Sequence, residues 1–325
     1  MAGLVVMSRR KRQKVEGCLG YYHLMSRTVN GEALFGGVER EVLRKMIWQV
    51  CGFSGIRVIT YAVMKNHFHL FVEVPGEREI SDAELVRRYR ILYPKPTPWQ
   101  PMRAEVLEKQ LAADGPEGRW LRKELSARMH DVSWLMKTLK QRFSVWYNHK
   151  KERFGPLWSE RFKSVLVEGD QWALRTVAAY IDLNAVRAGL VEDPKDYRFC
   201  GYGEAVGGSR LAKQGLSLVG RDLAGYRQTL YGSGSGPKEG KEFIGREEAV
   251  RVLEKEKGKL PLPVILRCRV RYFTDGRVLG SEAFVQEHAD AEREGRVRPP
   301  RVHGMQGADW GGLSVLGGLR KDLFG

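Results

Sequence analysis

The chain has 325 residues, of which 42% are hydrophobic, so it is long enough to bury the core of one large or two modest domains. Its formal net charge of +16 favours a polyanionic partner, with nucleic acid ahead of an anionic membrane. No apolar run reaches the roughly 18 residues of a membrane span, so we expect no membrane partner. Four widely spaced cysteines without a CxxC pair are typical of reduced thiols, which predicts a cytoplasmic protein.

The first part of the chain alternates between strand and helix patterns. The strand-like runs are rich in β-branched and aromatic residues, whereas the helical stretch repeats apolar residues every three or four positions. Lys65-Asn66 separates two strand-like runs so closely that we expect a tight hairpin. The predicted elements, in order, are a basic N-terminal arm over 1–19, a strand over 21–27, a helix over 38–50, and strands over 56–64 and 67–74.

Residues 77–131 are predicted to form a helical insertion. Ser81 and Glu84 make a capping box that opens a helix, and four prolines between 94 and 101 then impose an extended break. Two charged helices, over 103–113 and 117–130, complete the insertion. Their composition indicates a solvated helical elaboration, with contact to a nucleic acid as the less favoured alternative.

The second half contains the strongest helix prediction, over 132–151, where apolar residues recur at 3.6 spacing. A strand over 161–168 follows, and then a helix that runs from the N-cap Asp170 to about Asn184. The remaining predicted segments are a Gly/Ser-rich linker over 206–244, a small helical module over 245–292 with helices near 246–257, 262–271 and 280–291, and a flexible tail over 293–325.

The order strand, helix, strand, strand, helix, strand over residues 20–205 matches the split βαβ arrangement. The predicted fold class is therefore α+β. We expect a ferredoxin-like antiparallel sheet with helices on one face, a helical insertion, and a small helical C-terminal module. The other face of the sheet, or one of its edges, would present His67 and His69.

These two histidines occupy one strand. Alternate residues of a strand point to the same side, so the imidazoles of His67 and His69 could close on one metal ion. A bare His-x-His is more often a pair of ordinary sheet histidines. A third ligand from elsewhere in the chain is therefore needed to favour a metal site.

Three motifs together resemble the single-tyrosine HUH transposases, and among them the REP-associated tyrosine transposases of the IS200-like superfamily. The motifs are Met64-Lys-Asn-His-Phe-His-Leu70, Gly155-Pro-Leu-Trp-Ser-Glu-Arg-Phe162 and Ala179-Tyr-Ile-Asp-Leu-Asn-Ala-Val-Arg-Ala-Gly-Leu190. Each is weak alone, but their joint presence in the family's order is specific. The resemblance covers roughly residues 18–205, and this chain has Lys65 and Ala185 where family members often have proline.

The resemblance implies an HUH-type tyrosine transposase, a single-strand DNA endonuclease and strand transferase, with residues 20–205 as its catalytic domain. Tyr180 would attack the scissile phosphorus and leave a 5′-phosphotyrosine and a free 3′-OH, which conserves a phosphodiester bond. His67, His69 and Asn184 would bind a divalent metal, Mg²⁺ or Mn²⁺. The DNA partner would be single-stranded or hairpin DNA, including palindromic repeats.

Each of these side chains also has an ordinary structural explanation. Tyr180 could be a core-edge tyrosine, and Asn184 could be a helix cap. Two other functions stay open, namely a domesticated hairpin-DNA-binding protein without cleavage activity and a metal-dependent phosphohydrolase that uses water. The residues leave undecided whether the active site belongs to a monomer or a homodimer. They also leave undecided which group deprotonates Tyr180, for which the candidates are His23, Glu73 and Asp182.

Basic residues are expected to contact DNA phosphates, with a solvated basic face as the alternative. The candidates are Arg9, Arg10, Lys11, Arg12, Lys137, Lys140, Lys150, Lys151, Arg153, Arg161, Lys163 and Arg187. The rival nucleophile is Tyr147, which lies on the helix over 132–151. It is disfavoured because the residue four positions on is Lys151, a cation that would repel a metal.

Overall fold

The computed structural model describes residues 13–15, 17–76, 78–95, 100–220, 222–231, 253, 258–268, 270–293, 300–320 and 323–324. Three predictions therefore lie outside the described residues: the basic cluster Arg9, Arg10, Lys11 and Arg12, the Gly/Ser run over 232–236, and most of the helix expected over 246–257.

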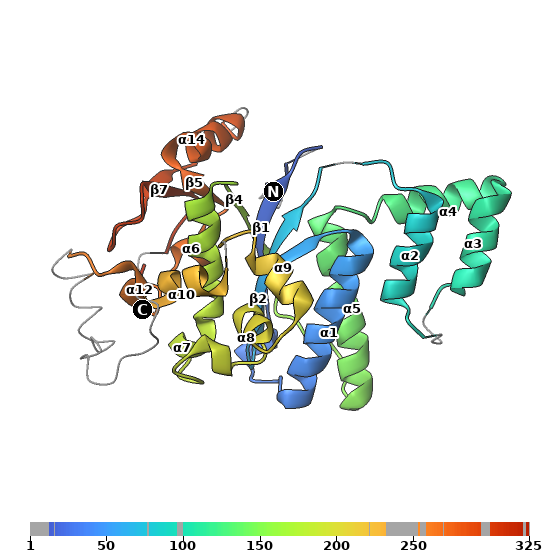
Figure 1. Cartoon of the computed structure of the whole chain (residues 1–325), viewed down its shortest axis with the longest axis horizontal. Helices are drawn as coiled ribbons and strands as arrows, with labels where there is room; N and C mark the ends of the chain where they lie inside the picture. The colour runs from blue at the N-terminus through green and yellow to red at the C-terminus, as the bar shows by residue number, and fades with distance from the viewer. Residues whose placement is uncertain are drawn as a thin grey trace, which may run out of the picture.

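A seven-stranded sheet runs through the molecule in the order β2-β3-β1-β4-β5-β7-β6 (Figure 1). The first four strands pair antiparallel in the predicted split βαβ order, β4 and β5 pair parallel, and the last three strands are antiparallel. The mixed α+β class with a mostly antiparallel sheet is thus confirmed. The strands are β1 Gly20–Arg27, β2 Arg57–Val63, β3 His67–Val74, β4 Lys163–Val167, β5 Val278–Ser281, β6 Val302–Gly304 and β7 Leu313–Leu316.

Helices cover both faces of the first four strands. Helices α1 (Gly37–Ser54) and α5 (Val132–Lys150) pack together on one face, where Trp48 of α1 meets Tyr61 of β2 edge to face. Helix α6 (Gln171–Asp182) packs against β2 and β3 on the opposite face, which is the face of the histidines. The two helices of the split βαβ unit thus share one face, and α6 covers the other.

The insertion forms a group of helices beside α1, at one end of the molecule in Figure 1. Its helices are α2 Asp82–Leu92, α3 Ala104–Ala113 and α4 Pro116–Ser126. The Ser81 side chain accepts a hydrogen bond from the Glu84 backbone N–H, so Ser81 caps the start of α2, while the Glu84 carboxylate accepts from Arg87 and Arg88.

The segments after residue 205 differ from the prediction. The stretch expected to be a linker over 206–244 contains two packed helices, α9 and α10, which bury Leu216 and Tyr226. The expected helical module also supplies strand β5, and the expected flexible tail supplies β6 and β7. The further helices are α7 Asn184–Arg187, α8 Gly201–Val206, α9 Arg210–Leu216, α10 Leu223–Tyr231, α12 Leu262–Ile265, α13 Tyr272–Asp275 and α14 Glu282–Ala291, with short 3₁₀ turns at Val29–Gly31 and Pro194–Asp196.

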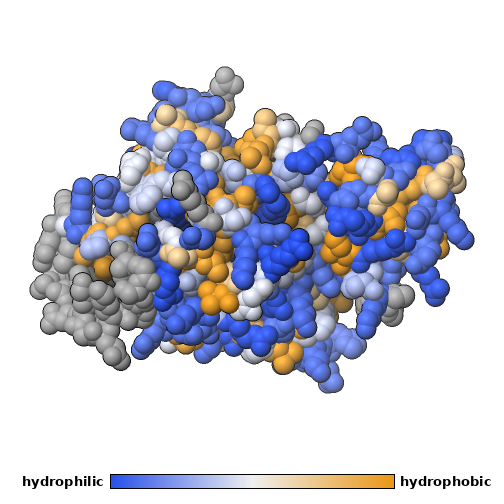
Figure 2. Space-filling view, in the orientation of Figure 1, coloured by the Kyte–Doolittle hydropathy of each residue, from blue (hydrophilic) through white to orange (hydrophobic). Residues whose placement is uncertain are grey.

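These C-terminal strands are only three or four residues long, too short for a clear alternation of apolar and polar residues. Of the three, β5 pairs with β4, β7 pairs with β5, and β6 pairs with β7, and local sequence does not encode these contacts. Figure 2 shows hydrophilic residues over most of the visible face. Within the described part of the chain, no helix has both the length and the apolar character that a membrane crossing requires.

Candidate active site

The two histidines open strand β3 and share one face, as the alternation predicts. His67 pairs with Arg27 at the end of β1, and His69 pairs with Met25. Their ring centres lie 5.1 Å apart. The two side chains differ in exposure, because His69 is only 4% exposed whereas His67 is half-buried at the rim of the sheet.

Tyr180 reaches this pair from α6. Asp170 caps the helix, with its carboxylate accepting hydrogen bonds from two backbone N–H groups of the first turn. The Tyr180 ring centre lies 6.2 Å from that of His69 and 6.4 Å from that of His23, which is on β1. Three separate elements thus bring the candidate nucleophile and a candidate metal ligand together.

The Tyr180 ring is enclosed and only 3% exposed. The ring of Phe273, in α13, stacks on it at 4.3 Å, and the Arg187 guanidinium lies 3.9 Å from its centre. Because both groups lie so close to the ring centre, they must occupy opposite faces of the ring. Arg187 also donates hydrogen bonds to the carbonyl oxygens of Tyr180 and Leu266, each at 2.7 Å.

This contact network includes a residue that the sequence grouped with the DNA-binding cations. The guanidinium of Arg187 is directed at protein carbonyls and at the tyrosine ring, where a cation–π contact is favourable. Leu266, a partner of Arg187, and Phe273, which stacks on Tyr180, both come from the region after residue 260. No sequence pattern connects that region with the site.

Asn184, the expected third metal ligand, lies one turn beyond Tyr180 and is buried. Helix α6 ends at Asp182, and α7 begins at Asn184 after Leu183, so the helical path continues past Tyr180 with only a small interruption. Among the described residues, no group of three His, Cys, Asp or Glu side chains could hold a metal ion. A metal site on His67 and His69 would therefore need a ligand of another type, for which the sequence offers the Asn184 amide.

The three candidates for a base take different positions. His23 lies against the Tyr180 ring. Asp182 points instead toward β2 and α10, where its carboxylate accepts hydrogen bonds from Thr60 at 2.8 Å and Tyr226 at 2.7 Å. Burial raises the pKa of Asp182 to about 6. Glu73 is paired with Arg57 near the opposite end of the strands. Of the three, His23 is the group that contacts the candidate nucleophile.

The described basic candidates follow α5 and the loop that leads into β4. Backbone bonds from this loop to β1 place it beside the strand end that carries His67, since the N–H of Ser159 donates to the carbonyl of Arg27. Lys150 and Arg161 are exposed there. The other candidates contact protein groups: Lys137 lies over the ring of Trp134, Lys140 donates to the carbonyl of Glu160, Lys151 pairs with Glu39, Arg153 donates to the carbonyl of Pro156, and Lys163 pairs with Asp275.

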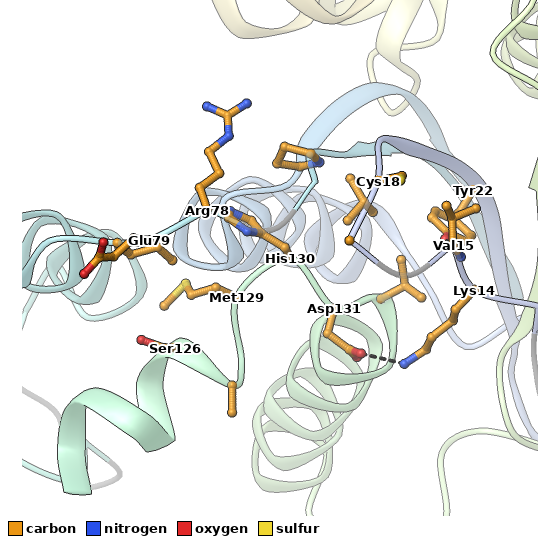
Figure 3. A pocket seen from close by; sticks show the side chains of 16 residues that line it. Lys14, Val15, Cys18, Tyr22, Arg78, Glu79, Ser126, Met129, His130 and Asp131 are labelled. Atoms are coloured by element: carbon orange, nitrogen blue, oxygen red, sulfur yellow. Dashed lines mark hydrogen bonds and ion pairs between the residues drawn. The ribbon is translucent and has the colours of Figure 1, made fainter. Parts of the chain in front are cut away.

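A groove of about 640 Å³ lies elsewhere, at the opposite end of β1 and β3 (Figure 3). Lys14 reaches across it to pair with Asp131 at 2.5 Å, and Arg78 and His130 also line it. Neither candidate histidine of β3 nor Tyr180 lines this groove. It is thus separate from the candidate site.

Comparison with known proteins gives two findings. The family model described as an IS200-like transposase matches residues 18–90, which contain β1 to β3 and both histidines of β3 but not Tyr180. Among solved structures, a REP-associated tyrosine transposase bound to a REP hairpin is 16% identical to this chain. It aligns with 63% of this chain and 90% of that one at a TM-score of 0.40. Comparison with curated proteins finds no match. The family match shows that residues 18–90 of this chain are similar to the IS200-like transposases.

Proposed function

We propose that this chain is a DNA strand transferase that cleaves and rejoins one strand of DNA through Tyr180. The observation that carries the proposal is the meeting of Tyr180 with His69 and His23 on the histidine face of the sheet. These residues come from α6, β3 and β1. An ordinary core tyrosine has no need of two histidines at its ring edge.

In the proposed reaction, the phenol oxygen of Tyr180 attacks the scissile phosphorus as its proton leaves. The bond from phosphorus to the 3′ oxygen breaks, which leaves a 5′-phosphotyrosine and a free 3′-OH. The number of phosphodiester bonds is unchanged. Attack by another 3′-OH therefore restores Tyr180 and joins the strands without an external energy source.

The residues present fit a divalent cation, Mg²⁺ or Mn²⁺. His67, His69 and Asn184 would hold it, and all three are neutral ligands, so the ion would keep its charge for the phosphate. When bound, such an ion polarises a phosphoryl oxygen and helps to place the phosphate. The donors fit because burial lowers the pKa of His69 well below its usual value and keeps its ring neutral, as a metal ligand must be.

The proposed substrate is single-stranded or hairpin DNA, including palindromic repeats. A nucleophile on the protein needs a backbone that it can reach, which unpaired DNA offers. The net charge of +16 and the exposed cations Lys150 and Arg161 near the His67 end of the sheet support phosphate contact.

The test is a covalent trap with hairpin DNA labelled on either side of the cleavage point, followed by denaturing electrophoresis. Wild-type protein is expected to form an adduct that carries the 5′-phosphate, and Tyr180→Phe should form none while it still binds DNA. Tyr147→Phe is the matched control. Tyr147 is a buried tyrosine on α5, and its loss should leave the adduct unchanged. An adduct peptide that contains Tyr147, or an adduct in Tyr180→Phe, contradicts the proposal.

The enclosure of Tyr180 favours a second candidate function, a domesticated hairpin-binding protein that does not cut. In that protein the tyrosine would be a core residue between Phe273 and Arg187. The same trap separates the two functions. Tight hairpin binding without an adduct, under Mg²⁺ and under Mn²⁺, would identify the binding protein.

A further inference from the structure

A buried chain of hydrogen bonds links the backbone of α13 to His69. The carbonyl oxygen of Phe273 lies 3.0 Å from Nδ1 of His23, and Nε2 of His23 lies 2.8 Å from Nδ1 of His69. The two imidazole rings are stacked with centres 5.0 Å apart. His23 is 1% exposed and His69 is 4% exposed, so the chain is screened from water.

The carbonyl at one end fixes the direction of every bond in the chain. A carbonyl oxygen can only accept, so Nδ1 of His23 must carry a proton. The ring of His23 is buried, and its two nitrogens contact a carbonyl and another imidazole rather than a carboxylate that would stabilise a cation, so the ring is neutral and its Nε2 has a lone pair. Nδ1 of His69 must then donate to that lone pair. The neutral ring of His69 is left with its own lone pair on Nε2.

His67 reaches the same state by a separate local contact. The Asn66 amide nitrogen donates to the carbonyl of Gly31 at 2.8 Å, which directs the amide oxygen of Asn66 to Nδ1 of His67 at 2.6 Å. Nδ1 of His67 is therefore the donor in that bond. In its neutral form, His67 therefore has the same tautomer as His69, with its lone pair on Nε2.

We propose that His23 is a positioning residue that holds His69 in the tautomer with its lone pair on Nε2, and that the Phe273 carbonyl sets this tautomer from the C-terminal region. Only the use of that lone pair as a metal ligand rests on the proposed function. The tautomer itself follows from the hydrogen bonds of the protein. Groups that orient a metal-binding histidine in this way typically change metal affinity when they are removed.

The direct experiment measures the tautomer of His69 in the metal-free, full-length protein by long-range ¹H–¹⁵N NMR of labelled histidine. We expect a protonated Nδ1 and an unprotonated Nε2 in wild-type protein. The opposite tautomer for His69 overturns the proposal. This readout needs neither DNA nor metal, so it stands even if Tyr180 forms no adduct and the proposed function fails.

Two substitutions test the role of His23. In His23→Gln the side-chain oxygen can accept from His69 while its nitrogen donates to the Phe273 carbonyl, so the tautomer should persist. In His23→Leu neither bond forms, and we expect His69 to lose its single tautomer and Mn²⁺ affinity to fall roughly 10- to 100-fold by calorimetry. Wild-type Mn²⁺ affinity in a folded His23→Leu protein contradicts the role of His23. If His23→Leu does not fold, loss of the tautomer or of Mn²⁺ binding in His23→Gln contradicts it.

His288→Leu is the matched control. Nδ1 of His288 also contacts a backbone carbonyl, that of Phe284, at 2.9 Å, but on α14 and away from the Tyr180 ring. Its replacement should leave the His69 tautomer and the Mn²⁺ affinity unchanged. If His288→Leu lowered Mn²⁺ affinity as much as His23→Leu does, the effect would be general destabilisation and the proposal would fail.

Discussion

The two sides of the candidate site are built differently. The histidine side comes from one short hairpin, β2 and β3, within the segment that matches the family model. The tyrosine side depends on Phe273 and Leu266, which follow Tyr180 by a long stretch of chain. His67 lies at the rim, whereas Tyr180 is enclosed. The positions of the two histidines are therefore locally determined, whereas residues after 260 surround the candidate nucleophile and also reach His69 through His23.

The largest expected effect is on the histidine side. Both His67→Ala and His69→Ala should abolish metal-dependent adduct formation, since each removes one proposed ligand. Only His69→Ala should also lower stability, by about 1–3 kcal/mol, because it leaves His23 buried without its partner. Adduct assays and denaturant unfolding measure the two effects. If both variants lost the same free energy of unfolding, the proposed difference between His67 at the rim and the buried His69 would be contradicted.

The next largest effect concerns Asp182, the last residue of α6, whose carboxylate accepts hydrogen bonds from residues of β2 and α10. Burial raises the pKa of its carboxyl from an unfolded value near 3.8 to about 6, so the folded state binds the proton more tightly. Stability from this group is present below about pH 4 and is lost as pH rises to about 6, a change of about 3 kcal/mol. Asp182→Asn should remove that loss. The Tm of the variant should therefore rise relative to the Tm of wild type as the pH increases from 4 to 7.

Asp193→Asn is the control of opposite sign. Burial opposes ionisation of Asp193, but hydrogen bonds from Arg227 and from the backbone of Lys195 outweigh burial and lower its pKa. Its contribution to stability is present above the unfolded pKa and is lost as pH falls. Asp193→Asn should therefore cost stability at neutral pH and cost less in acid. If stability relative to wild type changed with pH in the same direction in both variants, the assignment of opposite pKa shifts to Asp182 and Asp193 would be refuted.

A smaller effect is expected for Phe273, whose ring stacks on Tyr180. Phe273→Ala removes the stacked ring but keeps the backbone carbonyl that contacts His23. Loss of the stacking energy should raise the rate of adduct formation roughly two- to tenfold. Phe284→Ala, a half-buried ring on α14, is the control and should not change the rate. A slower reaction in a folded Phe273→Ala protein would mean that the ring positions Tyr180 for reaction rather than covering it.

The smallest effect should come from the exposed cations near His67. Lys150→Ala with Arg161→Ala should weaken hairpin binding and reduce the slope of log affinity against log salt by about 1 to 2, as expected when two phosphate contacts are lost. Lys109→Ala on α3 removes an exposed cation from the insertion and should not change the slope. An unchanged slope in the double variant would place the DNA elsewhere.

Sequence patterns predicted the parts of the fold that local periodicity encodes. The alternation in 67–74 placed both histidines on one face, and the N-cap Asp170 placed Tyr180 on the helix that packs against β2 and β3. The patterns could not predict α9 and α10 inside a Gly-rich stretch, because their helical state depends on burial of residues such as Tyr226. They also could not predict β5, whose four residues are stabilised by pairing with β4.

In the candidate site, too, locally encoded features were predicted and long-range contacts were not. The pair His67 and His69 and the residue Tyr180 were predicted, and the structure brings Tyr180 to His69. The contacts of His23 and Arg187 with groups after residue 260 were not predicted, because no local pattern connects these residues with that region. A long-range contact between an imidazole and a backbone carbonyl leaves no periodic signal in the sequence.

The position of Phe273 late in the chain has a consequence during synthesis on the ribosome. Tyr180 and both histidines of β3 are synthesised well before α13. Translation of each hundred residues takes roughly 5–20 s. For that interval the tyrosine has no stacked ring over it, and His69 has no carbonyl to fix its tautomer through His23. In the nascent chain, Tyr180 and His69 therefore lack their contacts with α13, and synthesis of Phe273 supplies both the stacked ring and the carbonyl.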